Sequence, residues 1–271
     1  MANSLTQAAE LIHNADGLVI CAGAGMGVDS GLPDFRGNSG FWKAYPGLAA
    51  KGVRFEEIAN PSAFLDYPTL VWEFYSHRIN LYRSTRPHAG FAMLKRWCDK
   101  KPHGGFVYTS NVDGHFQKAG FADRKINECH GSLAYLQCSE PCGNHLWPTP
   151  QAINPSQPPS CPECGELARP NVLMFNDWGA IHERAEDKYQ AFEAWFQAVK
   201  NPVVIELGAG TAIPSVRRFS ATLAVPIVRI NPQEHRIEPP HVAVPMGALE
   251  GIQVLHQAIS SLQEGPSHAT T

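Results

Sequence analysis

Short apolar runs alternate along this chain with stretches in which apolar residues recur at helical spacing. The apolar runs occupy residues 17–22, 106–109, 203–207 and 226–230. The helical patterns occupy residues 61–84, 88–100, 182–200 and 247–262, and a further helix is expected over residues 5–13 with Ser4 as its N-cap. Fully apolar runs are typical of strands buried on both faces. Their alternation with helices predicts an α/β fold with a doubly wound, mostly parallel sheet.

Residues 132–170 interrupt this alternation. They are rich in proline, lack helical periodicity and contain four of the seven cysteines. Cys138 and Cys142 form a C-x3-C pair, and after 18 residues Cys161 and Cys164 form a C-x2-C pair. Two such pairs, each followed by glycine, are typical of a closed, structural zinc site, and a segment too small for its own core needs such a staple. Four unrelated thiols or two disulfides are the alternatives.

The interruption suggests how the chain divides. We expect a large domain from residues 1–131 and 171–263, a zinc-binding insertion at 132–170 and a disordered tail at 264–271. Part of the helical segment 40–84 is a candidate to join the small domain. The remaining cysteines lie in or beside apolar runs and are expected to be ordinary core residues: Cys21, Cys98 and Cys129.

Composition and charge narrow the class of protein. The chain has 271 residues, of which 44% are hydrophobic, enough for a large buried core. The net charge of −3, without a long run of one sign, argues against nucleic-acid binding. No apolar run has the roughly 18 residues that a membrane span needs, and the first residues do not resemble a secretion signal. The cysteines are odd in number, and two pairs of them lie close together in the sequence. Both features favour a reducing compartment, so we expect a soluble, cytoplasmic protein. Its oligomeric state is not indicated.

Glycine and polar residues follow several of the predicted strands, at the positions where ligands of open α/β sheets bind. These groups are Gly23-Ala24-Gly25, residues 109–113, residues 208–211 and Asn231, and a further group, Cys129-His130-Gly131, lies directly before the insertion. A glycine turn lets the backbone approach a pyrophosphate, and an Asn or Asp beside it can bond ribose hydroxyls or position a water. Each group alone also has an ordinary structural explanation, as a tight turn or a satisfied polar side chain.

Taken together and in this order, the groups resemble the motifs of the sirtuins, the NAD-dependent protein-lysine deacylases. The resemblance runs from about residue 15 to residue 255, nearly the whole chain. It implies a Rossmann-like domain with a small zinc-binding domain, and NAD and an acyl-lysine peptide that meet in the cleft between them. In that family NAD is consumed: the acyl oxygen attacks the ribose carbon as nicotinamide leaves, and the acyl group passes to ADP-ribose.

The resemblance also implies roles for individual residues. His130 is implied as the general base on a ribose hydroxyl, with Asn111 beside it in the catalytic centre, and a neutral imidazole suits that role. The implied cofactor-binding residues are Gly23, Ala24, Gly25, Asp34, Phe35, Arg36, Ser110, Asn111, Asp113, Gly208, Gly210, Thr211 and Asn231. The implied peptide-binding residues are Val172, Met174 and Phe175.

A further match concerns the acyl group. Residues 71–78 are similar to a helix of the desuccinylating and demalonylating branch, whose Tyr-x-x-Arg pair falls on Tyr75 and Arg78. Residues at i and i+3 share one helix face, and Tyr and Arg can both donate to a carboxylate. The resemblance therefore implies succinyl- or malonyl-lysine as substrate, with acetyl-lysine as the alternative. An ordinary helix with a partly buried Tyr75 and a surface Arg78 is the structural alternative.

A few positions depart from the family pattern. Ser110 stands where Gln is usual, Gly27 and Ala212 stand where Ser is usual, and Asn176-Asp177 replaces Gly-Glu. The leading hypothesis is an NAD-dependent lysine deacylase that uses NAD and structural zinc. The departures keep two others open: an ADP-ribosyltransferase or NAD-cleaving enzyme on the same fold, and an NAD or ADP-ribose sensor without turnover.

Overall fold

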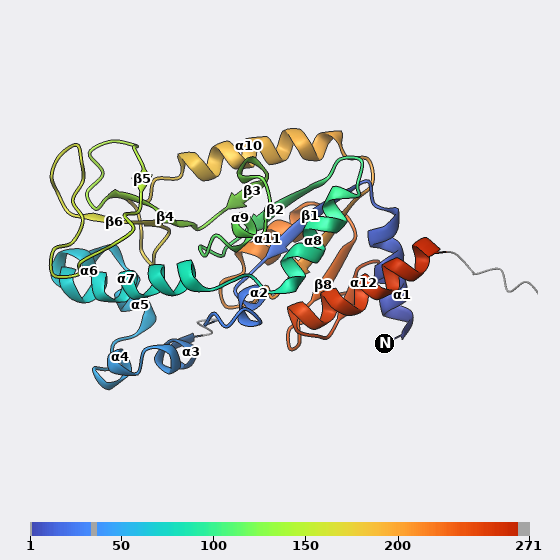
Figure 1. Ribbon diagram of the computed structural model, residues 1–271, viewed down its shortest axis with the longest axis horizontal. Coiled ribbons are helices and arrows are strands. Elements are labelled where there is room, and N and C mark those ends of the chain that lie inside the picture. Colours follow the sequence, from blue (N-terminus) through green and yellow to red (C-terminus); the bar gives the residue numbers. More distant parts are fainter. Residues whose placement is uncertain (1, 34–36, 265–271) are drawn as a thin grey trace, which may run out of the picture.

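A parallel sheet of six strands forms the centre of the larger part of the molecule (Figure 1). The computed structural model describes residues 2–33 and 37–264. The strand order across the sheet is β3-β2-β1-β7-β8-β9, so the chain winds outward from β1 first in one direction and then in the other. The strands are β1 (Gly17–Ala22), β2 (Gly105–Thr109), β3 (Ile126–Glu128), β7 (Pro202–Leu207), β8 (Ile227–Ile230) and β9 (Val242–Val244).

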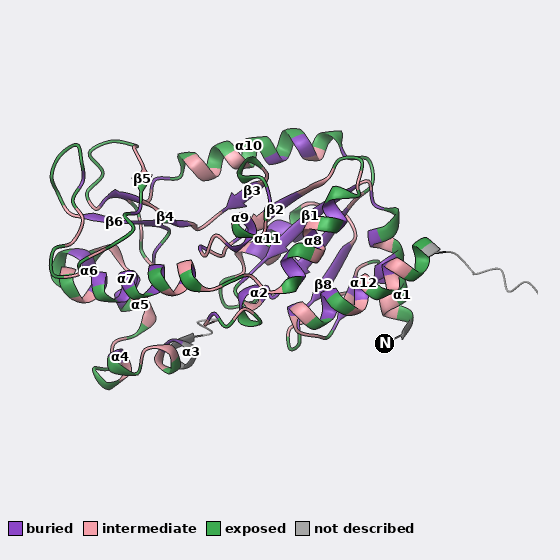
Figure 2. Ribbon diagram, viewed as in Figure 1, coloured by how far each residue is buried: buried purple, intermediate pink, exposed green. Residues whose placement is uncertain are grey.

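Helices cover both faces of this sheet, which explains why its strands are mostly buried and mostly apolar (Figure 2). Leu18 and Ile20 of β1 enter one core, and Val19 and Cys21 enter the other, because strand residues alternate between faces. The first core includes α1 (Ala2–Asn14), α8 (Ala89–Asp99) and α12 (Ala248–Glu264). The second includes α10 (Glu183–Ala198) and α11 (Ser215–Thr222). The prediction of a doubly wound α/β fold is confirmed.

A second, antiparallel sheet of three strands lies at the far end of the molecule from α1 and α12 (Figure 1). Its strands, in order, are β5 (Trp147–Pro148), β4 (Gly131–Cys138) and β6 (Ala168–Val172). Side chains of this sheet share one hydrophobic core with the helical segment that precedes α8. That segment contains α3 (Gly37–Ala44), α4 (Pro46–Ala50), α5 (Phe55–Ile58), α6 (Pro61–Asp66) and α7 (Pro68–Ser84). The domain boundaries themselves stay a prediction.

Three local predictions differ from the structure. Helix α1 begins at Ala2, so the prediction of Ser4 as its N-cap is wrong, because neither Ala2 nor Asn3 is a residue that stops a helix. The single helix expected over 61–84 is two helices separated at Tyr67, whose ψ of 55° is non-helical because the ring of Pro68 disfavours the helical conformation before it. Helix α12 includes Glu264, and the rest of the expected tail lies outside the described residues.

Short elements complete the part of the chain that the structure describes. They are α2 (Gly25–Val28), α9 (His115–Lys118) and a 3₁₀ turn at Asp123–Lys125. Strands β3 and β9 were not predicted, because three residues are too few to form a recognisable apolar run. Within residues 2–33 and 37–264, no helix combines the length and the apolar character needed to cross a membrane.

Candidate active site

Two glycine turns, one after β1 and one after β7, pack against each other at the carboxyl edge of the large sheet. The N–H of Gly25 donates to the carbonyl oxygen of Gly208 at 3.0 Å. A Cβ on Gly25 would lie 2.7 Å from the Cα of Gly208, and one on Gly23 would lie 2.8 Å from the Cα of Ala209. Gly208 also has a φ of 54°, which favours glycine. The contact between the turns therefore requires these glycines, while Ala24 stays exposed at the edge.

Hydrogen bonds from the end of β2 bring Asn111 to the first glycine turn. The Oγ1 of Thr109 donates to the carbonyl oxygen of Ala22 at 2.8 Å and accepts the N–H of Asn111 at 3.1 Å. The Nδ2 of Asn111 then donates to the carbonyl oxygen of Gly23 at 3.0 Å. The N–H of Ser110 is held by Ala22 at 3.2 Å. Three residues predicted from two separate motifs, Gly23, Ser110 and Asn111, are therefore neighbours.

The carboxyl group of Asp113 lies at the same edge of the sheet. Burial raises the pKa of Asp113 to about 6, although the N–H of His115 donates to its Oδ1 at 2.9 Å and the charges of Lys118 and Arg78 favour ionisation. A carboxyl group whose pKa is this close to neutrality gains from a hydroxyl donor, so it suits a ribose ligand. Three predicted cofactor residues lie outside the described residues: Asp34, Phe35 and Arg36.

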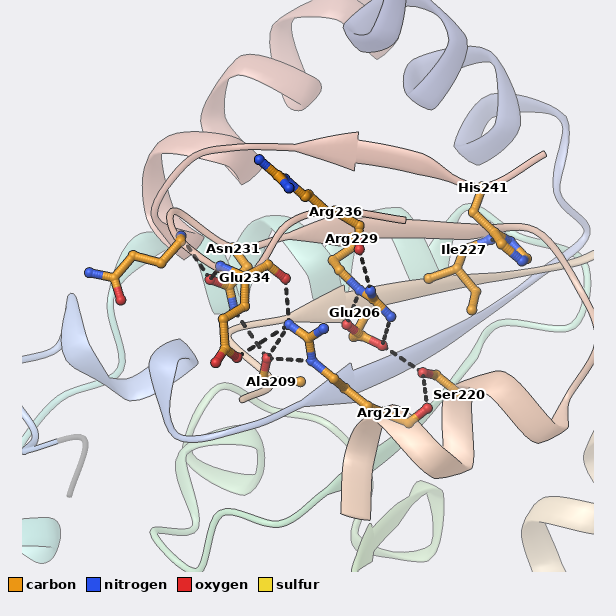
Figure 3. Close-up of polar contacts among 11 residues, drawn as sticks. Glu206, Ala209, Arg217, Ser220, Ile227, Arg229, Asn231, Glu234, Arg236 and His241 are labelled. Atoms are coloured by element: carbon orange, nitrogen blue, oxygen red, sulfur yellow. Dashed lines mark hydrogen bonds and ion pairs between the residues drawn. The ribbon is translucent and has the colours of Figure 1, made fainter. Parts of the chain in front are cut away.

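The loop after β8 is bonded to the second glycine turn (Figure 3). The Nδ2 of Asn231 donates to the carbonyl oxygen of Ala209 at 3.0 Å, and its Oδ1 accepts the N–H of Glu234 at 2.9 Å. The Oγ1 of Thr211 donates to Glu234 Oε1 at 2.7 Å. Asn231 is buried and holds the loop in place, whereas Gly210 and Thr211 are exposed. Glu234 was not predicted from the sequence, although an acidic residue about 20 residues after a glycine turn is a signal for ribose binding.

Buried charges anchor helix α11 and strand β8 behind this loop (Figure 3). The Nε of Arg229 lies 2.5 Å from Glu206 Oε1, and the Oγ of Ser220 donates to Glu206 Oε2 at 2.6 Å. The Nε of Arg217 donates to the carbonyl oxygen of Ala209 at 3.0 Å. Removing one partner of the Glu206–Arg229 pair would leave a buried charge unpaired, so the network holds α11 firmly. Its signal in the sequence is the single acidic residue within an apolar run.

His130 lies just beyond β3, and its ring contacts the first residue of α11. The Nε2 of His130 is 2.9 Å from the Oγ of Ser215. Burial lowers the pKa of His130, so the ring is neutral at pH 7 and has the lone pair that a general base needs. The N–H of Leu173 donates to the carbonyl oxygen of His130 at 2.9 Å, which ties the histidine to the segment after β6. Ser215 was missed because no motif marks it.

Aromatic side chains surround Tyr75 and Arg78 on α7. Arg78 is 8% exposed, and its Nε donates to Tyr82 Oη at 3.0 Å. The ring of Tyr75 lies 5.6 Å from that of Phe64 and 4.9 Å from that of Phe74, between centroids. Burial raises the pKa of Tyr75 to about 12, and its hydroxyl has no hydrogen-bond partner among the described residues. The alternative of a surface Arg78 is therefore wrong.

The predicted peptide-binding residues follow directly from β6. Val172 lies opposite Gly131 in the register between β6 and β4, and both Val172 and Met174 are 7% exposed. Phe175 is half-buried, and its N–H donates to the carbonyl oxygen of Ala59 at 2.9 Å. The side chains of Val172 and Met174 thus belong mainly to the core of the small sheet, and Phe175 is the more accessible of the three.

A buried ion pair shapes the same segment. The Nη1 of Arg169 lies 2.8 Å from Asp177 Oδ2, and both side chains have 0% exposure. Asp177 Oδ2 also accepts the N–H of Met174 at 3.2 Å. Asn176, which directly precedes Asp177, is exposed. Its φ of 54° is a left-handed conformation that Asn tolerates better than most residues. Asn176 therefore keeps a backbone shape that glycine adopts readily.

The four cysteines of residues 138–164 come together as the spacing predicts. Their sulfur atoms all lie within 4.8 Å of one another, with Cys138 to Cys164 at 3.6 Å and Cys142 to Cys161 at 3.7 Å. A disulfide has an S–S length of about 2.05 Å, whereas thiolates about 2.3 Å from a tetrahedral zinc ion lie about 3.8 Å apart. The donor set fits zinc, and four protein ligands leave no position for a reactive water, so the zinc is structural.

The other three cysteines are buried or half-buried. Cys21 and Cys98 are buried core residues, as expected, and Cys129 is half-buried beside His130. Burial raises the pKa of all three thiols, to about 12 for Cys98 and about 11 for Cys129. They therefore remain protonated near neutral pH, and a protonated thiol is a poor nucleophile.

Comparisons with known proteins show the family to which the chain belongs. The family model described as Sir2 family matches residues 23–198. An NAD-dependent protein deacylase of Thermus thermophilus is 32% identical over 258 residues, which is 93% of each chain. An NAD-dependent protein deacylase of Aquifex aeolicus is 36% identical over 160 residues, 59% of this chain and 62% of that protein. A solved Sir2 homolog–NAD complex is 25% identical, with a TM-score of 0.73 over 93% of both chains. The chain therefore belongs to the Sir2 family.

Proposed function

We propose that this chain is an NAD-dependent protein-lysine deacylase that prefers acyl groups ending in a carboxylate, of the succinyl or malonyl type. The observation that carries the preference is the burial of Arg78 and Tyr75 together in the aromatic cluster of α7. Placing a guanidinium and a phenol hydroxyl in such surroundings costs free energy of solvation. A bound acyl carboxylate offsets that cost, whereas an acetyl methyl group does not.

The electrostatics of the cluster support an anionic ligand. The positive charge of Arg78 acts on Tyr75, Tyr82 and Asp113, so its field covers the region between α7 and the carboxyl edge of the large sheet. Tyr75 shares a hydrophobic core with Val172 and Met174, and the charges of Arg169 and Asp177 act on its hydroxyl group. An acyl-lysine bound against that segment would bring its carboxylate to Tyr75 and Arg78.

The reaction itself is assigned to residues at the edge of the large sheet. We assign NAD binding to the two glycine turns together with Asn111 and Asp113. NAD, when bound, supplies the ribose carbon from which nicotinamide leaves. The neutral ring of His130 accepts the proton of a ribose hydroxyl. Main-chain hydrogen bonds of Cys129 and His130 hold the histidine in place. The zinc held by the four cysteines stabilises the small sheet.

Replacing Arg78 tests the acyl preference. We expect Arg78→Met to slow removal of succinyl groups from a lysine peptide by about 10- to 100-fold, the loss typical of a hydrogen bond to a charged group. Removal of acetyl groups should change little. Tyr75→Phe, which deletes only the hydroxyl, should give a smaller loss in the same direction. Arg86→Met, at an exposed arginine, is the matched control.

Mass spectrometry of the products, with NAD and paired succinyl, malonyl and acetyl peptides, measures each rate. Equal rates for all three peptides in the unmodified protein would contradict the acyl preference but not the deacylase activity. Nicotinamide release that is independent of peptide would instead favour an NAD-cleaving enzyme. Saturable NAD binding without any product would favour a sensor.

A further inference from the structure

Ser215 and His130 come from distant parts of the chain and meet at hydrogen-bond distance. The Oγ of Ser215 lies 2.9 Å from the Nε2 of His130. We propose that Ser215 is a positioning residue: its hydroxyl donates to Nε2 and so keeps that nitrogen unprotonated, as the basic atom of the ring. This inference rests on the role proposed above for His130, and it gives a role to a serine that no sequence motif indicates.

The first support is that Ser215 is held rigidly. It is the first residue of α11, and the helix is fixed at several points along its length (Figure 3). Arg217 donates to the glycine turn at Ala209, and Ser220 donates to the buried carboxylate of Glu206. The ring of Phe219 stacks on that of Tyr108 at 3.6 Å between centroids. The position of the Ser215 hydroxyl is therefore set by a packed helix.

His130 is held independently of that helix. The N–H of the preceding residue, Cys129, donates to the carbonyl oxygen of Thr109 at 2.9 Å, which ties it to the end of β2. The carbonyl oxygen of His130 accepts the N–H of Leu173 at 2.9 Å. The contact between His130 and Ser215 therefore joins two separately anchored elements, so it fixes the orientation of the ring about its side-chain bonds.

The chemistry of the two groups makes the direction of the hydrogen bond important. A neutral imidazole has one N–H and one bare nitrogen, and the partner of each nitrogen decides which is which. A serine hydroxyl can donate to the bare nitrogen. The positive end of the α11 dipole is close to Ser215 and disfavours a protonated imidazole. Both effects maintain Nε2 as a proton acceptor, and an incoming ribose hydroxyl can then take the place of the serine as donor.

Two variants separate the hydroxyl from the helix. Ser215→Ala removes the donor, and Ser215→Thr retains it. Thr222→Ala, at an exposed position of the same helix, controls for effects on the helix itself. We expect Ser215→Ala to lower kcat by about tenfold, a fraction of the full contribution of a general base, with the KM for NAD changed less than about twofold. Ser215→Thr should recover most of kcat, and Thr222→Ala should match the unmodified protein.

A spectroscopic readout tests the hydrogen bond without relying on turnover. Nitrogen-15 chemical shifts of the histidine side chains, with His130→Asn to assign the signals, report which ring nitrogen carries the proton. We expect Nε2 to be unprotonated in the unmodified protein and in Ser215→Thr, and the two tautomers to be mixed in Ser215→Ala.

Three outcomes would overturn the inference: an Nε2 that carries the proton in the unmodified protein, an unchanged tautomer and kcat in Ser215→Ala, or a faster Ser215→Ala enzyme. The last would mean that Ser215 competes with the ribose hydroxyl. Failure of the proposed function looks different, because the unmodified protein would then remove no acyl group from a peptide, whereas the ring tautomer of His130 would still change in Ser215→Ala.

Discussion

The two sheets of this molecule are held together by different interactions. The six-stranded sheet lies between two apolar cores, and two glycine turns follow its strands at the carboxyl edge. The three-stranded sheet shares an apolar core with the helices on one side, and polar groups hold it on the other. There, Gln137 Oε1 accepts from Asn171 at 2.9 Å and from Ile181 at 3.2 Å, and Arg169 pairs with Asp177.

This contrast indicates how each region responds to change. Apolar contacts are non-directional and numerous, so the loss of one is graded. Buried hydrogen bonds and ion pairs are directional, and the loss of one partner leaves the other without solvent or counter-charge. We therefore expect the small sheet to be sensitive to single polar substitutions. We expect the large sheet to be sensitive where its backbones are in contact and, among its polar groups, at the buried Glu206–Arg229 pair.

The largest expected effect is in the small sheet. Asp177→Ala leaves the guanidinium of Arg169 buried without its partner and should lower the free energy of unfolding by about 3–5 kcal/mol. Asp99→Ala breaks the exposed Lys95–Asp99 pair and should cost less than about 1 kcal/mol. Urea denaturation of the zinc-loaded protein, followed by circular dichroism, measures both. The double variant Arg169→Met with Asp177→Leu should recover much of the loss; equal costs for the two alanine variants would contradict the comparison.

A glycine substitution tests the large sheet. A Cβ on Gly25 would lie 2.7 Å from Gly208 Cα, so Gly25→Ala must separate the two turns and should cost about 1–3 kcal/mol. It should also weaken NAD binding, which calorimetry measures directly. Gly27→Ala is the matched control, since a Cβ there would make only ordinary contacts, at 3.4 Å with Leu32 and at 3.7 Å with Asp113 Oδ2, and would meet no backbone. Equal stability and NAD affinity in the two variants would show that the turns do not need their close contact.

The smallest effect concerns Asp113 and depends on pH. Its pKa is raised from 3.8 to about 6 in the folded protein, so folding favours the protonated carboxyl. The stabilisation by the protonated carboxyl is fully present below the pKa of the unfolded state. It is lost as the pH rises through the pKa of the folded state. Asp113→Asn should therefore gain in melting temperature relative to the unmodified protein between about pH 4 and pH 6, by a few degrees, with no further gain above. Scanning calorimetry without NAD measures this. A gain that is independent of pH would argue against a titrating Asp113.

Local patterns predicted much of the fold. Strands β1, β2, β7 and β8 lie within one residue of their apolar runs, because strands covered on both faces are predominantly apolar. Strand β3 escaped notice because it is short and includes the buried polar residues Asn127 and Glu128. The zinc ligands were predictable because two short turns determine most of the site, and the sequence shows the spacing of both.

The contacts that complete the candidate site were not predictable in the same way. Ser215, Arg217 and Glu234 act on residues in other elements, and no local period or spacing marks such pairs. The burial of Arg78 is a similar case. Helical spacing places it on the same face as Tyr75, but only the packing of the aromatic cluster shows that the guanidinium is buried.

The sequence by itself determined the order of the elements, the glycine turns, the metal ligands and the types of side chain available for chemistry. These are properties of neighbouring residues. The tertiary structure decided which polar groups are buried, which glycines pack against each other and which serine reaches His130. Burial and contact depend on segments far apart in the chain, because folding brings them together only when all the elements pack at once.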